Sequence, residues 1–292
     1  MDVVERCLFN GVISGMSLDG KRFFYVNPLE VNPEASEKDY NKKHVKPERQ
    51  KWFGCSCCPP NIARLLSSIG GYAYECNENS VYMNLFVGGK IKAVLNGKKN
   101  VFKVETEYPW NGTVEINVEN EEDSAFTYAI RIPNWCEKYK LTINGEIEEY
   151  NLEKGYIMLE REWRNGDKIV LSMDMPVVLV EANPKVREDI GKVAVMRGPI
   201  VYCVEEVDNG AQLQEVYLEE SPEFDVCFEE NLLKGVVTLT TEGKRVSENG
   251  WSEVSLYRTY KGKEYQKQQL KFIPYYSWTN RGVGEMSVWV RI

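Results

Sequence analysis

Three cysteines crowd one short segment of the sequence, residues 54–61, which reads GCSCCPPN. Cys55, Cys57 and Cys58 lie directly ahead of a predicted helix. A thiol acts as a nucleophile or a metal ligand only as the thiolate. The dipole and the N–H groups of a helix N-terminus stabilise negative charge, and the two prolines after Cys58 fix the approach of the chain. The pattern therefore favours a metal site or a cysteine nucleophile at Cys57 and Cys58.

Two other readings of this cluster remain open. Cys55 and Cys58 form a C-x-x-C pair, which is a weak signal for redox chemistry or zinc, and the sulfurs could be buried core groups. A tetrahedral zinc site needs four ligands, which adjacent cysteines cannot all supply. His44 is the one histidine, and we expect it in a solvated loop. The missing ligands must therefore come from elsewhere.

The other five cysteines are isolated in periodic segments, and we expect them to be small core residues. They are Cys7, Cys76, Cys136, Cys203 and Cys227.

Composition excludes several classes of protein. With 292 residues and 43% hydrophobic content, the chain has the size of two or three globular domains. A net charge of -8 without a concentrated basic face argues against nucleic-acid binding, and neutral ligands such as sugars fit better. No stretch is apolar for the roughly 20 residues that span a bilayer, and the first residues lack the features of a secretory signal. We expect no membrane partner and a cytoplasmic location.

The elements that position the cysteines are predicted by hydrophobic periodicity. Residues 2–20 have helical spacing, and a second helix starts at Asn61 with Ile62, Leu65, Leu66 and Ile69 on one face. From about residue 77 the pattern becomes short alternating runs separated by Asn-Gly turns, which predicts an antiparallel β-sandwich over 77–178. A second β unit follows. The fold class is therefore mainly β with an α-helical N-terminal remnant.

Several strings in the sequence carry a resemblance to a known family. They are RFFYVNPLEV, KWFGCSCCPPNIARLLSSIGGYAYE, VYMNLFVGG, RIPNWC, MRGPIVYC and IPYYSWTNRGVGEMSVWVR. Together they resemble the C-terminal part of glycoside hydrolase family 127, which contains retaining β-L-arabinofuranosidases. The resemblance implies the last part of an α/α-barrel catalytic domain over 1–76, then β-sandwich 1 over 77–178 and β-sandwich 2 over 179–285. Residues 286–292 could join β-sandwich 1.

The same resemblance implies roles for individual residues. Cys57 matches the nucleophile that forms a thioglycosyl intermediate, and Cys58 matches a ligand of Zn²⁺. Tyr25 is similar to a tyrosine that lines the substrate pocket near the nucleophile. The substrates implied are L-arabinofuranosyl oligosaccharides or glycoconjugates.

The sequence departs from the family pattern in one respect. The other zinc ligands and the acid/base glutamate of the family belong to a Glu-x-Cys element and a glutamate upstream of the segment that matches Met1. Glu5-Arg6-Cys7 has the right spacing, but we interpret this match as accidental. We therefore expect little activity from the chain alone, and a second chain that completes the barrel, or a homodimer, is an expected partner.

Two rival functions stay open. One is a carbohydrate-binding or structural β protein whose exposed tryptophans stack on sugars, and the other is a thiol redox protein. The candidate tryptophans are Trp110, Trp135, Trp163, Trp251 and Trp278. Glu30, Glu48 and Glu75 could replace the missing acid/base, although we expect solvated or structural roles for all three.

Overall fold

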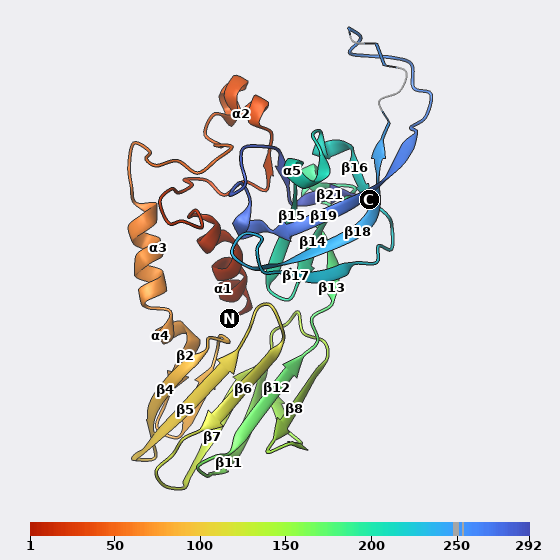
Figure 1. The fold of residues 1–292 in the computed structure, drawn as a ribbon. Coiled ribbons are helices and arrows are strands. Elements are labelled where there is room, and N and C mark those ends of the chain that lie inside the picture. The colour runs from red at the N-terminus through yellow and green to blue at the C-terminus, as the bar shows by residue number, and fades with distance from the viewer. Residues whose placement is uncertain (248–250, 253) are drawn as a thin grey trace. The chain divides into compact units, whose positions relative to one another are not determined.

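The computed structural model describes residues 1–247, 251–252 and 254–292, which form two compact units (Figure 1). The first unit contains Met1–Phe9 and Pro60–Pro176, and the second contains Asn10–Pro59 and Val177–Ile292. The N-terminal remnant expected over 1–76 is therefore not a compact body of its own. Its residues are shared between the two units.

The helices are few and short. α1 (Asp2–Arg6) continues into a π-helical stretch over Cys7–Val12, so the predicted first helix exists but ends well before residue 20. α2 (Pro33–Lys38) is capped by the Asn32 side chain, which accepts a hydrogen bond from the Ala35 N–H. The others are α3 (Cys58–Ser67), α4 (Gly70–Ala73) and α5 (Glu206–Asn209). Among the described residues, no helix has both the length and the apolar character that crossing a bilayer requires.

The first unit is a sandwich of two sheets. The five-stranded sheet has the order β10 (Asn151–Glu153), β11 (Tyr156–Trp163), β7 (Ser124–Arg131), β3 (Ser80–Met83) and β2 (Tyr74–Cys76). The six-stranded sheet has the order β4 (Gly89–Leu95), β5 (Lys98–Thr106), β6 (Thr113–Val118), β12 (Lys168–Met173), β8 (Tyr139–Ile143) and β9 (Glu146–Ile147). Every pair is antiparallel except β3 with β7.

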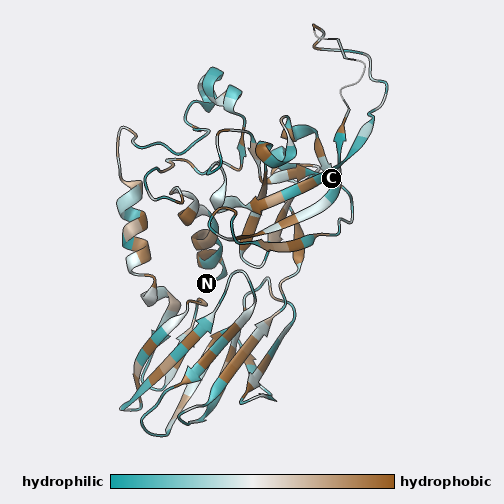
Figure 2. Ribbon diagram, in the orientation of Figure 1, coloured by the Kyte–Doolittle hydropathy of each residue, from teal (hydrophilic) through white to brown (hydrophobic). Residues whose placement is uncertain are grey.

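Alternation along the strands builds the core of this sandwich. In β6, Val114, Ile116 and Val118 are buried, while the residues between them are only partly buried. The same alternation gives the banded colouring of the strands in Figure 2. Two of the predicted Asn-Gly turns have both residues at positive φ, at Asn96-Gly97 and at Asn144-Gly145, as two-residue hairpin turns require.

The strands of the second unit form one hydrogen-bonded network, not two separate sheets. They are β1 (Glu30–Val31), β13 (Val177–Glu181), β14 (Lys192–Arg197), β15 (Ile200–Glu205), β16 (Val216–Leu218), β17 (Asp225–Glu229), β18 (Val236–Val246), β19 (Tyr265–Pro274), β20 (Met286–Ser287) and β21 (Trp289–Arg291). The path runs from β15 through β19, β18, β16 and β21 to β14, and the β14–β15 hairpin closes it.

The C-terminal strands belong to this second network. β20 pairs with β15 and β1, and β21 pairs with β14 and β16. The expectation that 286–292 could join the first sandwich is therefore wrong. Valine, tryptophan and methionine at the chain end predict a strand, but they do not specify which sheet receives it.

Candidate active site

The cysteine cluster lies at the start of α3. The helix begins at Cys58, ahead of the predicted start at Asn61, because proline is tolerated in the first turn of a helix. Cys55 and Cys57 are exposed and Cys58 is partly buried. The Cys57 Sγ atom lies 4.0 Å from the Cys55 Sγ and 3.9 Å from the Cys58 Sγ. The structure thus groups the three thiols around Cys57, in a position open to solvent.

Tyr25, which the family resemblance implied as a pocket-lining residue, lies beside these sulfurs. Phe23 and Tyr25 point to the same side of an extended segment, and both rings pack against Phe53, with centroids at 5.0 and 5.6 Å. Tyr25 is 51% exposed, and its hydroxyl lies beside the thiols of Cys55 and Cys57. These contacts raise the pKa of Tyr25 to about 12, and the Tyr25 contact lowers the pKa of Cys55. A phenol that keeps its proton can donate a hydrogen bond to a thiolate.

Cys58 has the opposite tendency. Burial first, and then the Cys57 sulfur, raise the pKa of the Cys58 thiol. The two prolines that follow have no N–H, so the first turn of α3 offers fewer donors than an ordinary helix N-terminus. The helix start alone therefore does not ionise Cys58, contrary to the expectation that it would favour the thiolate there. A bound cation would reverse this preference, because metals bind the deprotonated thiol.

The donor set fits part of a zinc site. Two thiolates on one tetrahedral Zn²⁺, each about 2.3 Å from the metal, are roughly 3.8 Å apart, close to the observed separation of Cys57 and Cys58. Within the described residues, however, no three His, Cys, Asp or Glu side chains converge as a metal site requires. His44 is exposed in its loop. Cys57 and Cys58 could thus supply two zinc ligands, and the others would come from a different segment.

Glu5 is buried in the first unit and serves a structural role there. Its carboxylate lies 2.5 Å from the Arg131 guanidinium and accepts hydrogen bonds from the Tyr108 hydroxyl at 2.8 Å and the Trp135 indole at 3.2 Å. Only 1% of Glu5 is exposed. The spacing of Glu5-Arg6-Cys7 therefore does not create a metal site, and this agrees with our interpretation of the match as accidental.

The other candidate acids have surface positions. Glu48 pairs with Arg22 at 3.2 Å, and Glu30 pairs with Lys192 at 3.6 Å. Glu75 is exposed on β2. In none of these contacts does the carboxylate of Glu30, Glu48 or Glu75 meet one of the three thiols.

The isolated cysteines and the tryptophans correct two expectations. Cys136 and Cys203 are buried, but Cys7, Cys76 and Cys227 are exposed, so the core assignment is wrong for these three. Trp163 and Trp278 are fully buried, Trp110 and Trp135 are partly buried, and Trp251 is 47% exposed. Of the five candidates for sugar stacking, Trp251 is therefore the most exposed, although the Arg258 guanidinium lies 4.3 Å from the centroid of its ring.

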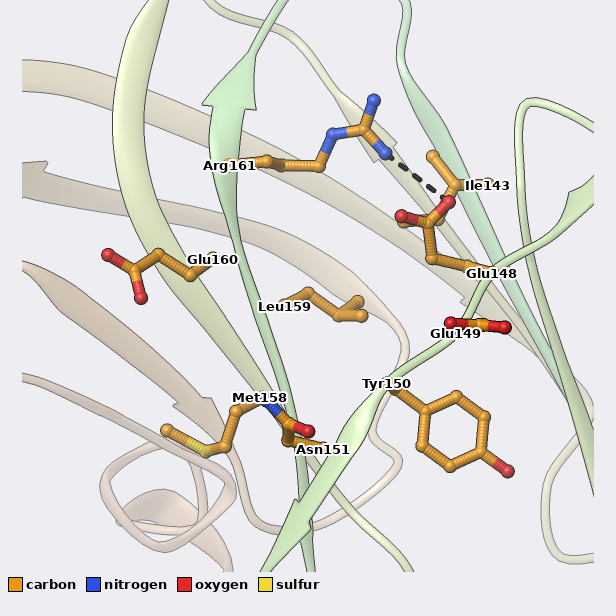
Figure 3. A pocket seen from close by; sticks show the side chains of 9 residues that line it. All are labelled: Ile143, Glu148, Glu149, Tyr150, Asn151, Met158, Leu159, Glu160 and Arg161. Atoms are coloured by element: carbon orange, nitrogen blue, oxygen red, sulfur yellow. Dashed lines mark ion pairs between the residues drawn. The ribbon is translucent and has the colours of Figure 1, made fainter.

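The first unit carries a separate pocket of about 470 Å³ on the sandwich (Figure 3). Tyr150 stands at one side of it, and an ion pair of 3.7 Å joins Arg161 to Glu148. The lining residues are Ile143, Glu148, Glu149, Tyr150, Asn151, Met158, Leu159, Glu160 and Arg161. This pocket contains no thiol, so it is not part of the cysteine cluster.

Sequence reasoning missed Phe53 and Arg49. Phe53 supports Tyr25 by ring contact, and the aromatic residues at 23, 25 and 53 were the available signal. Arg49 is buried in the second unit, although it lies in a polar stretch that resembles a surface loop. No local pattern marked it.

Comparison with known proteins places the cysteine cluster at the start of α3, and the β units that follow it, in a family of glycoside hydrolases. Three sequence models of one family match successive parts of the chain: the β-L-arabinofuranosidase GH127 catalytic domain at residues 1–71, the GH127 middle domain at 80–175 and the family 127 C-terminal domain at 177–291. The chain belongs to glycoside hydrolase family 127.

Individual relatives agree with this assignment. A non-reducing end β-L-arabinofuranosidase of Bifidobacterium longum subsp. longum is 37% identical over 299 residues, which cover 99% of this chain and 45% of the relative. The crystal structure of a family 127 β-L-arabinofuranosidase from Geobacillus stearothermophilus T6 superposes with a TM-score of 0.95 at 48% identity, covering 99% of this chain and 46% of that one. A second solved β-arabinofuranosidase of the family has a TM-score of 0.86 at 37% identity, covering 100% of this chain and 45% of its own. This chain spans less than half the length of these relatives.

Proposed function

We propose that the chain supplies the nucleophile-bearing part of a retaining β-L-arabinofuranosidase. The observation that carries the proposal is the position of Cys57: it is exposed, it directly precedes α3, and it lies between two other thiols within reach of the Tyr25 hydroxyl. Family membership suggests the class of reaction, and the exposed thiol of Cys57 is a side chain that could perform it.

The reaction would proceed in two displacements. The Cys57 thiolate attacks the anomeric carbon, the C1–O bond to the leaving group breaks, and a general acid protonates the departing oxygen. A base then takes a proton from water, the water oxygen attacks C1, and the C1–S bond breaks with return of the thiolate. Inversion at each step gives overall retention.

The thiolate has to be stabilised both before attack and on departure. Zn²⁺ held by Cys57 and Cys58 would supply that stabilisation, because a coordinating thiol is deprotonated. The Tyr25 hydroxyl can donate a hydrogen bond to the same sulfur.

The acid/base and the remaining zinc ligands are proposed to lie on the part of the family's catalytic domain that precedes the matched residues. α3 offers a surface for it. Ile62, Leu65 and Ile69 on one face are only partly buried, and Leu66 is 39% exposed. An amphipathic helix normally buries such a face against another element. Whether the preceding segment belongs to the same polypeptide or to a second chain, it would cover this face.

Complementation tests this proposal. The preceding catalytic segment of the Geobacillus relative is expressed separately and mixed with the chain, and hydrolysis of an aryl β-L-arabinofuranoside is measured with and without added zinc. We expect activity only from the mixture. Cys57→Ser should abolish it, while the exposed-cysteine control Cys227→Ser should retain it. Vigorous hydrolysis by the chain alone would contradict the need for the second segment.

Carbohydrate binding without turnover is a second candidate, favoured by the 47% exposure of Trp251, one face of which is covered by Arg258. Titration with arabino-oligosaccharides distinguishes the two. Binding that is lost in Trp251→Ala and unchanged in Cys57→Ser, without hydrolysis by the complemented protein, would support this candidate over the glycosidase.

A further inference from the structure

Arg49, shortly before the cysteine loop, is a buried cation in the second unit with 3% of its surface exposed. Arg131 of the first unit is buried to the same degree but forms ion pairs with Asp2 and Glu5. Arg49 forms no ion pair in the described part of the chain. Burying an unpaired charge is costly unless other groups replace its hydration. The groups around Arg49 must therefore compensate for the lost hydration of its charge.

Main-chain carbonyls surround the Arg49 guanidinium. Nε donates to the Ser14 carbonyl at 3.0 Å, Nη1 to the Trp278 carbonyl at 2.6 Å and Nη2 to the Tyr276 carbonyl at 3.0 Å. These carbonyls come from two segments far apart in the sequence. The planar guanidinium of an arginine has N–H donors in fixed directions, so it can bind all three carbonyl oxygens at once. The ammonium group of a lysine lacks this geometry.

Aromatic rings complete the surroundings. The Arg49 guanidinium carbon lies 4.6 Å from the centroid of the Phe24 ring and 5.9 Å from that of Trp278, and these two rings stack at 4.7 Å with an interplanar angle of 7°. Burial lowers the pKa of Arg49 to about 10, so the side chain stays charged at neutral pH. The contact joins Phe24 to the turn at residues 275–278.

The chain continues directly from this anchor to the thiols. Gln50 and Phe23 exchange two backbone hydrogen bonds of 2.9 Å. Because Phe23 and Tyr25 alternate with Phe24, their rings face away from Arg49 and pack on Phe53. Tyr25 in turn contacts Cys55 and Cys57. A continuous series of contacts therefore runs from Arg49 to the proposed nucleophile.

We propose that Arg49 is a positioning residue for the cysteine loop, residues 50–57: by binding the Ser14, Tyr276 and Trp278 carbonyls it fixes the Phe23–Tyr25 segment and the Gln50 bridge, and so places Cys57 against Tyr25. Its catalytic consequence rests on the proposed function. The restraint on the loop is a property of this chain alone and can be measured without substrate or metal.

Amide hydrogen exchange of the 292-residue chain tests the restraint. In Arg49→Met, which keeps the length of the side chain but loses its donors, exchange of the hydrogen-bonded Phe23, Phe24 and Gln50 amides should accelerate about tenfold or more, because these amides then open locally. Arg49→Lys retains the charge without the fork, so its exchange should be intermediate. If Arg49→Met does not fold, the comparison of Arg49→Lys with the unmodified chain decides.

Arg245 provides a matched control in the same unit. It also donates to carbonyls, those of Asn209, Ala211 and Gln212, but it has no contact with the cysteine loop. Arg245→Met should accelerate exchange around residues 209–212 and leave the Phe23, Phe24 and Gln50 amides unchanged, and Arg49→Met should show the reverse. Equal acceleration of both regions in both variants, or unchanged exchange of the Phe23, Phe24 and Gln50 amides in Arg49→Met, would overturn the proposal.

The complemented protein provides the catalytic readout. Because the substrate contacts remain, Arg49→Met should lower kcat about tenfold with KM nearly unchanged. A loop effect without activity in any version of the protein would leave the positioning role intact and refute the proposed function. Activity that is unaffected in Arg49→Met would refute the catalytic part of this inference while the proposed function stands.

Discussion

The Arg131 guanidinium lies 2.5 Å from the Glu5 carboxylate, and the two side chains are 4% and 1% exposed. This ion pair joins helix α1 to strand β7 within the first unit. Tyr108 and Trp135 donate to the same carboxylate, so the buried charges are paired and hydrogen-bonded. Such a pair is difficult to break from one side, because the remaining charge stays buried.

We predict that Glu5→Gln lowers the free energy of unfolding by about 3 kcal/mol, since it leaves the Arg131 charge without its buried partner. Denaturant unfolding followed by circular dichroism measures the change. Glu242→Gln is the control: Glu242 pairs with Lys267 at 3.3 Å, with both side chains at least 80% exposed, and its loss should have no measurable effect. Equal effects from both variants would contradict this account of Glu5.

The thiols of the cluster should differ in reactivity. The Tyr25 contact lowers the pKa of Cys55, while burial raises that of Cys58. As the pH rises, Cys55 should therefore be carboxymethylated by iodoacetate before Cys58 in zinc-free protein, which peptide mass spectrometry can follow. Tyr25→Phe removes the donor and should shift the Cys55 reaction to higher pH. Simultaneous modification of both cysteines at every pH would argue against these environments.

Gly112 is required by close packing. A Cβ atom at this position would lie 2.1 Å from the Met173 carbonyl oxygen. Gly112→Ala should lower the free energy of unfolding by roughly 1–3 kcal/mol, because the β6 and β12 ends must separate. Gly71→Ala, in the same unit with nothing within 4 Å of the added carbon, is the matched control and should be tolerated. Thermal melting of both variants distinguishes a clash from a general intolerance of alanine.

Glu229 should make the free energy of unfolding depend on pH in the acidic range. The Lys271 ammonium at 2.7 Å, and then the Thr238 hydroxyl, lower the pKa of the Glu229 carboxyl. A lowered folded-state pKa means that the contribution of Glu229 is present above the unfolded pKa of about 4.3 and is lost as the pH falls through the folded value. The difference in unfolding free energy between the protein and Glu229→Gln should therefore shrink below about pH 4. A difference that grows on acidification would contradict this sign.

Local patterns in the sequence predicted much of the fold. The Asn-Gly turns at residues 96 and 144 and the alternation in strands such as β6 are short-range signals, and the structure shows both. Long-range relationships were not predictable in the same way. Glu5 and Arg131 are 126 positions apart, and the closure of the second network depends on which strands pair.

The candidate site shows the same division. Three cysteines beside two prolines are visible in one line of sequence, and Tyr25 was predicted through the family resemblance. Arg49 was not predictable, because its partners are carbonyls, which every residue carries. The partial burial of Cys58 was also not predictable, because the periodicity of α3 indicates only which residues share a face.

The most direct measurement for the central claim is the mass of the Cys57 peptide from the complemented protein, quenched in acid during turnover of an aryl β-L-arabinofuranoside. The account predicts a peptide heavier by one anhydropentosyl group, with the sugar on Cys57. The same experiment with the Cys57→Ser variant should give no such peptide. Turnover with an unmodified Cys57, or with the sugar on another residue, would contradict it.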